Sequence, residues 1–566
     1  MYAFYKFCHY LPGYKFIFYA YSLKKRASSL LWKKATKVFS FKGSAHRKNW
    51  WTHIQTLDAE AETTGMTLAS AYPPAGTGLV KHSELETLSQ GVIPQVNDEP
   101  VVSVLVPEAL SWSSLHGLVV GNTSHERSGT IPGVGLVHAP FSLLPSPFPR
   151  QAFSQAIELA PLFNRLIDRV SQDANFLQQA LARTRKADSF TARLLDIHLQ
   201  ILDKGVKQEI RLGLHRSDYM LDMATGNLLQ VELNTISSSF AALGSLVTSL
   251  HRHLINWSGD RSGLEAKNVP ENSAADTFAE ALALAWKEYG DNRAVVLMVV
   301  REEERNMYDQ YWLALKLFKS YGIKLIRKTL SQVIAEGKLG SNNELFIGKQ
   351  VVSVVYYRAG YSPDDYPSES EWDARLLLEL STAVKCPNIS YHLAGAKKIQ
   401  QELAKPGILE RFFENKQEIV KVRSCFAGLW SLEDENSDEI IKEAIRNPEG
   451  FVLKPQREGG GNNTYGADVS EKLIQLRKTD GGVGLAAYIL MQRIFPAVHP
   501  AYLVHDGIWS CKETISELGI FSTYLRNGKK EVLNKEAGYL LRTKVADSNE
   551  GGVAAGYAVL DSLYLI

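Results

Sequence analysis

The chain is short of cysteine and of excess charge, and these two absences exclude several classes of protein. It has four cysteines in 566 residues and no C-x-x-C pair, which argues against a zinc site or a disulfide framework and favours a reducing compartment. Its 63 basic residues nearly match its 61 acidic residues, so the net charge of +2 gives no electrostatic case for a nucleic acid partner. Because no apolar run reaches about 18 residues, we also expect no membrane span.

The common catalytic motifs are absent too. The fourteen histidines form no H-x-x-x-H metal pattern, and no serine stands in a G-x-S-x-G elbow. No pairing of a nucleophile with a base is evident elsewhere in the sequence. Catalysis would then depend on positioning and electrostatics around a phosphate group, as in phosphoryl transfer.

The most informative segment is Phe451–Gly466, with the sequence FVLKPQREGGGNNTYG. An apolar strand, Phe451–Leu453, leads through Lys454 into a loop with three consecutive glycines, whose backbone amides can approach a phosphate closely. Glu458 in this loop offers a hard oxygen ligand for Mg²⁺. The loop lacks the Walker pattern, and the alternative is a surface turn with solvated charges. We interpret the segment as part of a metal–nucleotide site.

Two pairs of polar residues are spaced two apart on predicted strands, so each pair lies on one face of its strand. Glu232 and Asn234 could bind one cation together with Glu458, although a half-exposed strand gives the same alternation. Arg542 and Lys544 could bind a carboxylate and a phosphate, although two solvated residues on an edge strand would show the same spacing.

Two segments follow these pairs closely. Ile236–Ser239 supplies hydroxyls and amides that could hold a small polar substrate. The small residues of Glu550–Gly556 suit a mobile loop that closes over a site, and an ordinary flexible turn is the alternative.

Hydrophobic periodicity divides the chain into helical and strand-rich parts. Helical patterns cover 151–205 and 276–289, each followed by a glycine stop, and a hairpin is expected around Thr225–Asn227. From Arg293, strands and helices alternate over about 100 residues, which indicates a βαβ layer with a parallel sheet. We expect further helices at 307–321, 330–336 and 371–384, and strands at 212–222, 228–235, 294–300, 324–327, 345–347, 351–357, 451–453, 488–494 and 515–525.

The segment before Asp58 has eleven lysines and arginines and no acidic residue. An acid-poor basic start is typical of organelle transit peptides, and the alternatives are a poorly ordered tail or a mispredicted start codon. We therefore expect an extension at 1–57 and a body with the first metal and substrate strands at 58–292. An α/β substrate-binding domain at 293–395 and a lid with the glycine-rich and C-terminal substrate loops at 396–566 would follow.

These residues occur within longer motifs that resemble eukaryotic glutathione synthetases, members of the ATP-grasp superfamily. The motifs include LGLHRSDYM, VELNTISSSF, EERNMYDQ, LAGAKKIQQEL, VLKPQREGGGNN and GGVAAG, and RSGTIPGVGLVHAPFSLLP is most similar to plant members. The resemblance implies an α/β (α+β) fold, an ATP-grasp fold with an inserted parallel-sheet α/β substrate-binding domain. It also implies ATP-dependent ligation of γ-glutamylcysteine and glycine through an acyl phosphate, which gives glutathione, ADP and phosphate.

The matching motifs imply the residues of the site. Mg²⁺ would be held by Glu232, Asn234 and Glu458, and the catalytic residues would be Arg216, Arg542 and Lys544. ATP would contact Glu232, Lys397, Lys454, Gln456, Arg457, Glu458, Gly459, Gly460, Gly461, Asn462, Asn463, Tyr465, Met491, Gln492, Arg493, Ile494, Glu517, Lys544 and Glu550. The dipeptide and its product would contact Arg216, Ile236, Ser237, Ser238, Ser239, Glu304, Arg305, Asn306, Gln310, Arg358, Ala359, Gly360, Tyr361, Arg542, Val553 and Ala554.

Some positions depart from the animal pattern of the family. Ala359 and Glu550 each stand where an aspartate is usual, and Gln492-Arg493 stands in place of Glu-Lys. The small residues around Ala554 resemble those of family members that use glycine. A homoglutathione synthase that uses β-alanine and a non-catalytic nucleotide-binding regulator are the alternatives.

The residues and the resemblance together give expectations for the partners and the location. The partners would be the small-molecule substrates and a second copy of the chain in a homodimer, with no nucleic acid and no membrane. The location would be the cytoplasm, with plastid or mitochondrial targeting through residues 1–57.

Overall fold

The computed structural model of the chain describes residue 80, residue 88 and residues 99–566, except 435, 459, 460, 550, 551, 554, 555 and 557. The predicted extension 1–57 lies outside the described residues, as do the site predictions Gly459, Gly460, Glu550 and Ala554. The division of the chain at residues 292 and 395 stays a prediction.

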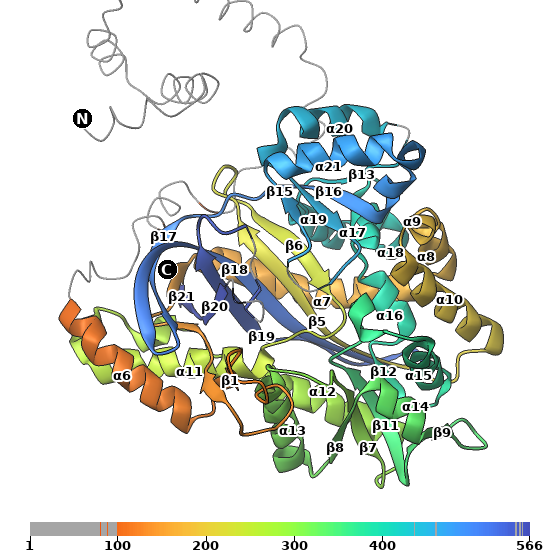
Figure 1. Cartoon of the computed structure of the whole chain (residues 1–566), viewed down its shortest axis with the longest axis horizontal. Helices are drawn as coiled ribbons and strands as arrows, with labels where there is room; N and C mark the ends of the chain where they lie inside the picture. The colour runs from red at the N-terminus through yellow and green to blue at the C-terminus, as the bar shows by residue number, and fades with distance from the viewer. Residues whose placement is uncertain are drawn as a thin grey trace, which may run out of the picture. The chain divides into compact units, whose positions relative to one another are not determined.

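The largest sheet of the described residues has seven strands, with a long hairpin near its middle (Figure 1). All of its ladders are antiparallel except the contact between β20 and β3. In order across the sheet, the strands are β17 (His499–His505), β3 (Phe141–Ser142), β20 (Ala558–Asp561), β19 (Lys530–Val545), β18 (Ile508–Asn527), β5 (Ile210–Leu221) and β6 (Leu228–Asn234). The predicted hairpin β5–β6 is confirmed, and the strand expected at 515–525 is longer than predicted.

Helices pack against both faces of this sheet. Neighbouring residues of a strand point to opposite faces, so each strand contributes to two separate cores. Leu541 on β19 packs in one hydrophobic core, which contains the apolar side of α7 (Arg150–Gln172). Its neighbour Leu540 packs in a second core, formed with α11 (Ala241–Ser258) and α12 (Ala274–Tyr289). The predicted helices at the start of 151–205 and at 276–289 are thereby confirmed.

The α/β segment after Arg293 forms a second sheet, in the order β8-β7-β11-β10-β9 with β12 also paired to β11. Parallel ladders join β7 with β8, β7 with β11, and β11 with β12, which confirms the predicted parallel layer. Its strands are β7 (Val295–Val299), β8 (Leu325–Lys328), β9 (Gly337–Leu339), β10 (Leu345–Ile347), β11 (Gln350–Tyr357) and β12 (Val384–Cys386), and its helices are α13 (Met307–Tyr321), α14 (Leu330–Glu336) and α15 (Glu369–Leu380).

The helix predicted at 371–384 is wrong at its C-terminal end. α15 ends at Leu380, because Ser381 adopts extended backbone and its Oγ donates a hydrogen bond to the carbonyl of Leu378. The buried residues of β12 follow and pair with β11, the preceding strand, on the other side of α15. Such a pairing is a tertiary contact, and local periodicity does not report it.

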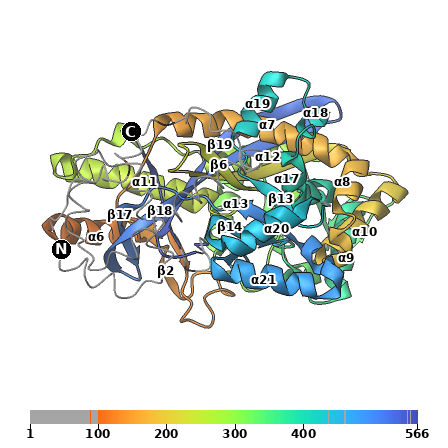
Figure 2. The same cartoon turned by 90° about the horizontal axis from the view of Figure 1, so that it is seen from above.

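A third sheet of four strands has a core of its own. β14 (Phe451–Pro455) and β16 (Tyr488–Gln492) pair in its middle, and β13 (Leu429–Ser431) and β15 (Thr464–Tyr465) lie at its edges. The helices α20 (Ser437–Arg446) and α21 (Ala467–Lys478) lie side by side and pack onto this core (Figure 2). The strand predicted at 451–453 is confirmed, and the one predicted at 488–494 ends two residues early.

The remaining elements are shorter or lie at the periphery of these sheets. They are α6 (Glu99–Leu115), α8 (Ala174–Leu181), α9 (Thr184–Ala187), α10 (Ser189–Lys204), α16 (Ile389–Ala394), α17 (Lys397–Ala404), α18 (Leu409–Phe412), α19 (Lys416–Ser424), β1 (Val119–Gly121), β2 (Leu136–His138), β4 (Ser146–Phe148) and β21 (Leu563–Leu565). Within the part of the chain that the structure describes, every helix is too short or too polar to cross a membrane.

A buried histidine links the stability of this fold to pH. His215 on β5 is fully buried, and its Nδ1 lies 2.9 Å from Oδ1 of Asn164 on α7. Burial lowers the pKa of His215 to about 4, although the nearby charge of Asp168 opposes this shift. The unfolded chain therefore binds a proton at this site more readily than the folded chain. The contribution of His215 to folding stability is present above about pH 6.5 and is lost as the pH falls toward 4.

We predict that His215→Gln makes the fold less sensitive to acid, because glutamine keeps a polar partner for Asn164 but cannot take up a proton. The difference between the pKa values of this histidine in the folded and unfolded chain lowers the free energy of unfolding by about 2 kcal/mol between about pH 7 and about pH 5. Urea unfolding at the two pH values measures this directly. The difference in unfolding free energy between wild type and variant should change by that amount from the higher to the lower pH. The same difference at both pH values would contradict the assignment.

Candidate functional site

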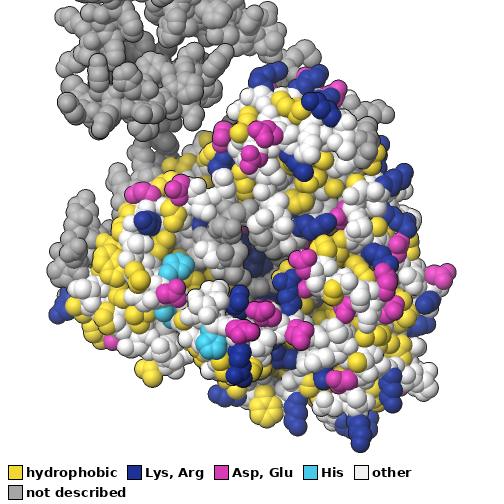
Figure 3. Space-filling model, in the orientation of Figure 1, with side chains coloured by type: hydrophobic (Ala, Val, Ile, Leu, Met, Phe, Trp, Pro, Cys, Tyr) yellow, Lys and Arg dark blue, Asp and Glu magenta, His cyan; other side chains and the backbone are white. Residues whose placement is uncertain are grey.

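A cavity of ≈ 360 Å³ lies where β14 and β16 of the third sheet face β5, β6, β18 and β19 of the largest sheet. Figure 3 shows one face of the molecule hollowed near its middle, with Lys and Arg side chains around the hollow. The cavity brings together most of the predicted site residues, although they come from distant parts of the chain. Those that line it are Arg216, Glu232, Asn234, Ile236, Ser237, Ser238, Ser239, Tyr361, Lys397, Lys454, Arg457, Glu458, Asn463, Tyr465, Met491, Gln492, Arg493, Ile494, Glu517, Arg542, Lys544 and Val553.

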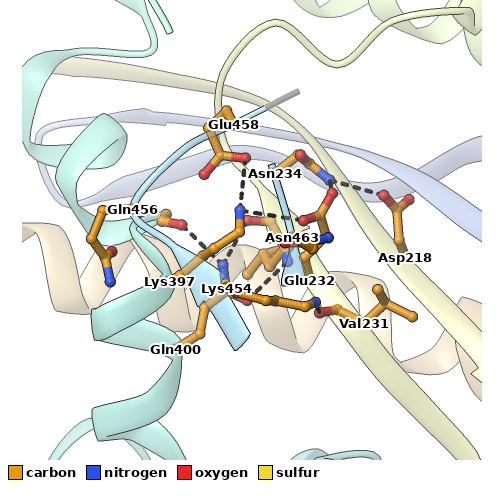
Figure 4. A network of polar contacts seen from close by, with 12 residues as sticks. Asp218, Val231, Glu232, Asn234, Lys397, Gln400, Lys454, Gln456, Glu458 and Asn463 are labelled. Carbon is orange, nitrogen blue, oxygen red and sulfur yellow. Dashed lines mark hydrogen bonds and ion pairs between the residues drawn. The ribbon is translucent and has the colours of Figure 1, made fainter. Parts of the chain in front are cut away.

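A buried lysine joins two carboxylates at the inner side of the cavity (Figure 4). Nζ of Lys397, at the start of α17, lies 3.4 Å from Oε2 of Glu232 on β6 and 3.5 Å from Oε2 of Glu458 in the loop after β14. The neighbouring Lys454 donates from Nζ to the carbonyl of Val231 at 2.9 Å. Two acidic and two basic groups from three segments therefore meet at one point.

These charges set the protonation of the two carboxylates. Burial alone would raise the pKa of Glu232, but the charges of Lys397 and Lys454 lower it below its ordinary value. Burial raises the pKa of Glu458 to about 7, and the negative charge of Glu232 adds to the shift while Lys397 opposes it. Any further positive charge that enters between the two carboxylates would favour the ionised form of both.

Two glutamines hold the segments that carry this cluster. The side chain of Gln400 on α17 accepts from Leu233 N on β6 at 3.2 Å and donates to Leu233 O at 3.1 Å. Oε1 of Gln456 accepts from Lys398 N at 3.1 Å and so satisfies a backbone donor in the first turn of α17. α17 is thereby fixed to both β6 and the end of β14. Gln456, a predicted nucleotide contact, does not itself line the cavity.

An arginine pair lies beside this cluster, on strands of the largest sheet. Arg216 on β5 and Arg542 on β19 both line the cavity, and both contact the carboxylate of Asp218, which is completely buried. Arg542 also pairs with Glu517 on β18. Asp218 was missed by the sequence reasoning, although its position two residues after Arg216 on one strand is the signal that could have found it.

The structure decides between the two interpretations of Arg542 and Lys544. Their strand, β19, lies between β18 and β20, so it is not an edge strand. Lys544 is 8% exposed, and its Nζ donates to the carbonyl of Asn549 at 2.8 Å. The alternative of two solvated residues on an edge strand is therefore wrong.

The serine segment after β6 is folded against the second sheet. Arg358 donates from Nη1 to Ser237 O at 2.7 Å and from Nη2 to Ser239 Oγ at 2.8 Å. Ser237 has a φ of 54°, a left-handed conformation that is uncommon for residues other than glycine. Arg358 does not line the cavity, but it holds two residues that do.

A second group of predicted substrate residues lies away from the cavity lining. The carboxylate of Glu304 accepts from Asn306 N at 2.8 Å and from Gln310 Nε2 at 3.1 Å. Oδ1 of Asn306 and Oε1 of Gln310 are buried without a hydrogen-bond partner among the described residues. Such atoms are costly to bury unpaired, so they mark a place where a polar ligand group would fit. The predicted residues Arg305, Ala359, Gly360, Gly461 and Asn462 likewise do not line the cavity.

The loop that contains Ala359 is held by hydrogen bonds, although Ala359 stands where an aspartate is usual in the animal pattern of the family. Ala359 is 3% exposed, and its backbone N–H donates to Val299 O at 3.1 Å. The carboxylate of Asp365 accepts from the backbone N–H groups of Gly360 at 2.8 Å and Tyr361 at 3.1 Å. The loop conformation therefore depends on Asp365 and not on a side chain at position 359.

Sequence reasoning also missed the apolar part of the cavity. Met220, Val452, Phe495, Pro496, Val498 and Ile515 line it beside the predicted Met491 and Ile494. Met220, Val452 and Ile515 come from three different strands, and Phe495, Pro496 and Val498 from the segment between β16 and β17, so no local pattern in the sequence groups them. The predicted hinge residue Gln492 accepts from Gly428 N at 3.0 Å, and Arg493 pairs with Glu449 at 2.8 Å, so both departures from the animal pattern have protein partners.

Known proteins share this sequence over most of its length. The family model of the ATP-binding domain of eukaryotic glutathione synthase matches residues 99–565. The chain is 57% identical over 469 residues to the chloroplastic glutathione synthetase of Arabidopsis thaliana, an alignment that covers 83% of this chain and 86% of that protein. It is 42% identical over 475 residues to the glutathione synthetase of Homo sapiens, with 83% and 98% covered. The chain belongs to the eukaryotic glutathione synthase family.

Membership of this family makes the chain an enzyme, a ligase of glutathione biosynthesis with an ATP-binding domain. This confirms the prediction of an enzyme and argues against the alternative of a non-catalytic nucleotide-binding regulator. A solved structure of a glutathione synthetase-like effector from Globodera pallida, in its apo form, aligns with a TM-score of 0.66 and covers 84% of this chain and 99% of that one. At 24% identity this likeness shows the fold alone, and it confirms the predicted fold class.

We predict that Gln400→Leu weakens the attachment of α17 to β6. Leucine leaves the buried N–H and C=O of Leu233 without their partner, which costs about 1–3 kcal/mol, and it separates the two elements that carry Lys397 and Glu232. The melting temperature should fall by a few degrees and the KM for ATP should rise. Gln417→Leu, at an exposed position of α19, is the matched control and should change neither. A Gln400→Leu enzyme with wild-type melting and wild-type KM would refute this role.

Proposed function

We propose that this cavity ligates γ-glutamylcysteine to glycine by way of an acyl phosphate. A cysteinyl carboxylate oxygen attacks the γ-phosphorus of ATP, and ADP leaves with the electron pair of the broken P–O bond. The glycine amine then attacks the acyl carbon and loses a proton, and phosphate leaves with the former carboxylate oxygen. The supporting observation is that three lysines suited to phosphate and two arginines suited to carboxylate line the same cavity: Lys397, Lys454, Lys544, Arg216 and Arg542.

We propose that the apolar part of the cavity holds the adenine and that the lysines hold the phosphates. Lys397 and Lys454 lie where β14 enters the glycine-rich loop, and Lys544 faces them from β19. The loop residue Arg457 donates to Oδ1 of Asp188 at 2.5 Å, which ties the loop to the start of α10. Positive charge fixed in advance around the transferring phosphoryl group stabilises the charge that develops there.

The donor set around Lys397 fits the predicted Mg²⁺. Glu232 and Glu458 offer carboxylate oxygens, and the Nδ2 atom of Asn234 donates to Asp218 at 3.0 Å, which leaves the amide oxygen as an acceptor. Mg²⁺ commonly binds one or two carboxylates together with substrate phosphates, so a site completed by ATP is expected. Among the described residues, groups of three or more His, Cys, Asp or Glu suited to a metal are absent. When bound, Mg²⁺ would neutralise charge on the phosphates.

We predict that Glu458→Gln abolishes most turnover without unfolding the enzyme, because glutamine keeps the shape of the side chain and removes its charge. Loss of one such transition-state contact costs about a hundredfold in kcat. Phosphate release and thermal melting measure the two effects. Glu439→Gln, at an exposed position of α20, is the control and should match the wild type. Turnover of Glu458→Gln within about threefold of wild type would remove Glu458 from the site.

We propose glycine as the acceptor, which the small residues of the C-terminal loop support. Residues 554 and 555 of that loop lie outside the described residues, so the argument rests on the sequence. One extra methylene is worth about 1–3 kcal/mol in a pocket, and we predict that glycine is favoured over β-alanine by about tenfold in kcat/KM. Phosphate release with γ-glutamylcysteine and each amino acid measures this ratio, with no acceptor as the blank. Equal use of both would support the homoglutathione alternative.

The finer assignments of partner, location and domains are proposals as well. The family resemblance supports a homodimer. The relatives from Arabidopsis thaliana and Solanum lycopersicum are chloroplastic enzymes by name, which supports a plastid location for this chain. Import of a fluorescent protein fused to residues 1–57 tests that location. The second sheet, whose strands all lie between Val295 and Cys386, supports the divisions at 292 and 395.

A further inference from the structure

Asp218 is the most deeply buried charged group beside the cavity, and neither the motifs nor the comparisons give it a role. Its side chain has no solvent exposure, and it does not line the cavity. Oδ1 accepts from Arg216 Nε at 2.6 Å, and Oδ2 accepts from Arg216 Nη2 at 2.8 Å, Asn234 Nδ2 at 3.0 Å and Arg542 Nη2 at 3.0 Å. One carboxylate therefore holds three side chains that line the cavity.

The contacts leave particular donors of the two arginines available. Asp218 takes the Nε–Nη2 edge of Arg216, and Nη1 of that arginine has only a long contact of 3.4 Å to Ser239 O. In Arg542, Nη2 is taken by Asp218 and Glu517, whereas Nε is buried without a hydrogen-bond partner among the described residues. An unpaired guanidinium N–H in a buried place is costly, so this donor suits an anionic ligand group.

A glycine opposite Asp218 makes room for this arrangement. Gly519 on β18 pairs with Asp218 across the ladder. A Cβ at position 519 would lie 2.6 Å from Oδ1 of Asp218 and 2.8 Å from Cδ of Arg216. Any side chain there would displace the carboxylate of Asp218 and the side chain of Arg216. The sequence thus has its smallest residue at the one neighbouring position where the Asp218–Arg216 pair needs space.

We propose that Asp218 is a positioning residue that orients Arg216 and Arg542 so that their remaining N–H groups bind the carboxylates of the dipeptide substrate. This inference rests on the proposed function of the two arginines. A buried carboxylate fixes both guanidinium planes before the substrate arrives, so that less ordering is needed on binding. Its negative charge also allows two cations to lie side by side on one wall.

The test is Asp218→Asn, which keeps the shape and replaces one acceptor by a donor that faces Arg216, Arg542 and Asn234. At saturating Mg²⁺, kcat/KM for γ-glutamylcysteine should fall about tenfold or more through a raised KM for the dipeptide, because misplaced binding groups weaken substrate positioning. The KM for ATP should rise less than the KM for the dipeptide, because Asp218 contacts Asn234 of the predicted Mg²⁺ ligands but none of the lysines that hold the phosphates.

The matched control is Asp168→Asn, which removes another buried carboxylate paired with an arginine. Asp168 is 1% exposed and accepts from Arg211 Nε at 2.7 Å, and neither residue lines the cavity. This variant should melt earlier but keep both KM values. A purely structural role for Asp218 would give the same pattern in Asp218→Asn and would overturn the inference.

Gly519→Ala is the second variant, and it tests the positioning role of Asp218 if Asp218→Asn does not fold. It keeps Asp218 and both arginines but displaces Asp218 and Arg216, so the KM for the dipeptide should again rise more than that for ATP. Wild-type KM values in the folded variants overturn the inference and leave the proposed function intact. Failure of the wild-type enzyme itself to release phosphate in the presence of the dipeptide would instead refute the proposed function.

Discussion

The burial of Lys397 between Glu232 and Glu458 is the constraint on which the rest of the site depends. Two carboxylates cannot be buried together without a counter-charge, because desolvation penalises each ion and like charges repel. Lys397 supplies that charge, and Gln400 and Gln456 hold its helix against β6 and β14. This arrangement determines where the third sheet meets the largest sheet, and the cavity lies at that junction.

Four arginines at or beside the site follow a common arrangement, since a buried aspartate lies against each of them. Asp218 holds Arg216 and Arg542, Asp188 holds Arg457, and Asp309 lies 3.7 Å from Arg358. These aspartates are 0%, 4% and 6% exposed. A guanidinium group has donors on several edges, so an aspartate can fix one edge and leave another for a ligand. The cavity is thus prepared for anions while each cation retains a partner in the protein.

The sequence predicts the local features of this enzyme well, because glycine stops, hairpin signals and strand alternation depend on neighbouring residues. The β5–β6 hairpin, α13 and the strand before Lys454 are examples. It fails where a tertiary contact decides, as at β12, which pairs with β11 across an intervening helix. The positions of Glu232 and Lys454 follow from motifs, but the role of Asp218 and the apolar lining from Met220 and Phe495 require the assembled sheets. Edge and central strands also look alike in sequence, so the setting of Lys544 needed the structure.

The central claim is that one cavity activates a carboxylate with ATP and then transfers the acyl group to an amine. The most direct measurement is the fate of ¹⁸O placed in the cysteinyl carboxylate of γ-glutamylcysteine during a single turnover with ATP and glycine. The account predicts that one labelled oxygen appears in the released inorganic phosphate, because the carboxylate oxygen that attacks phosphorus leaves with it. Phosphate free of label, or label found in a nucleotide, would contradict the account.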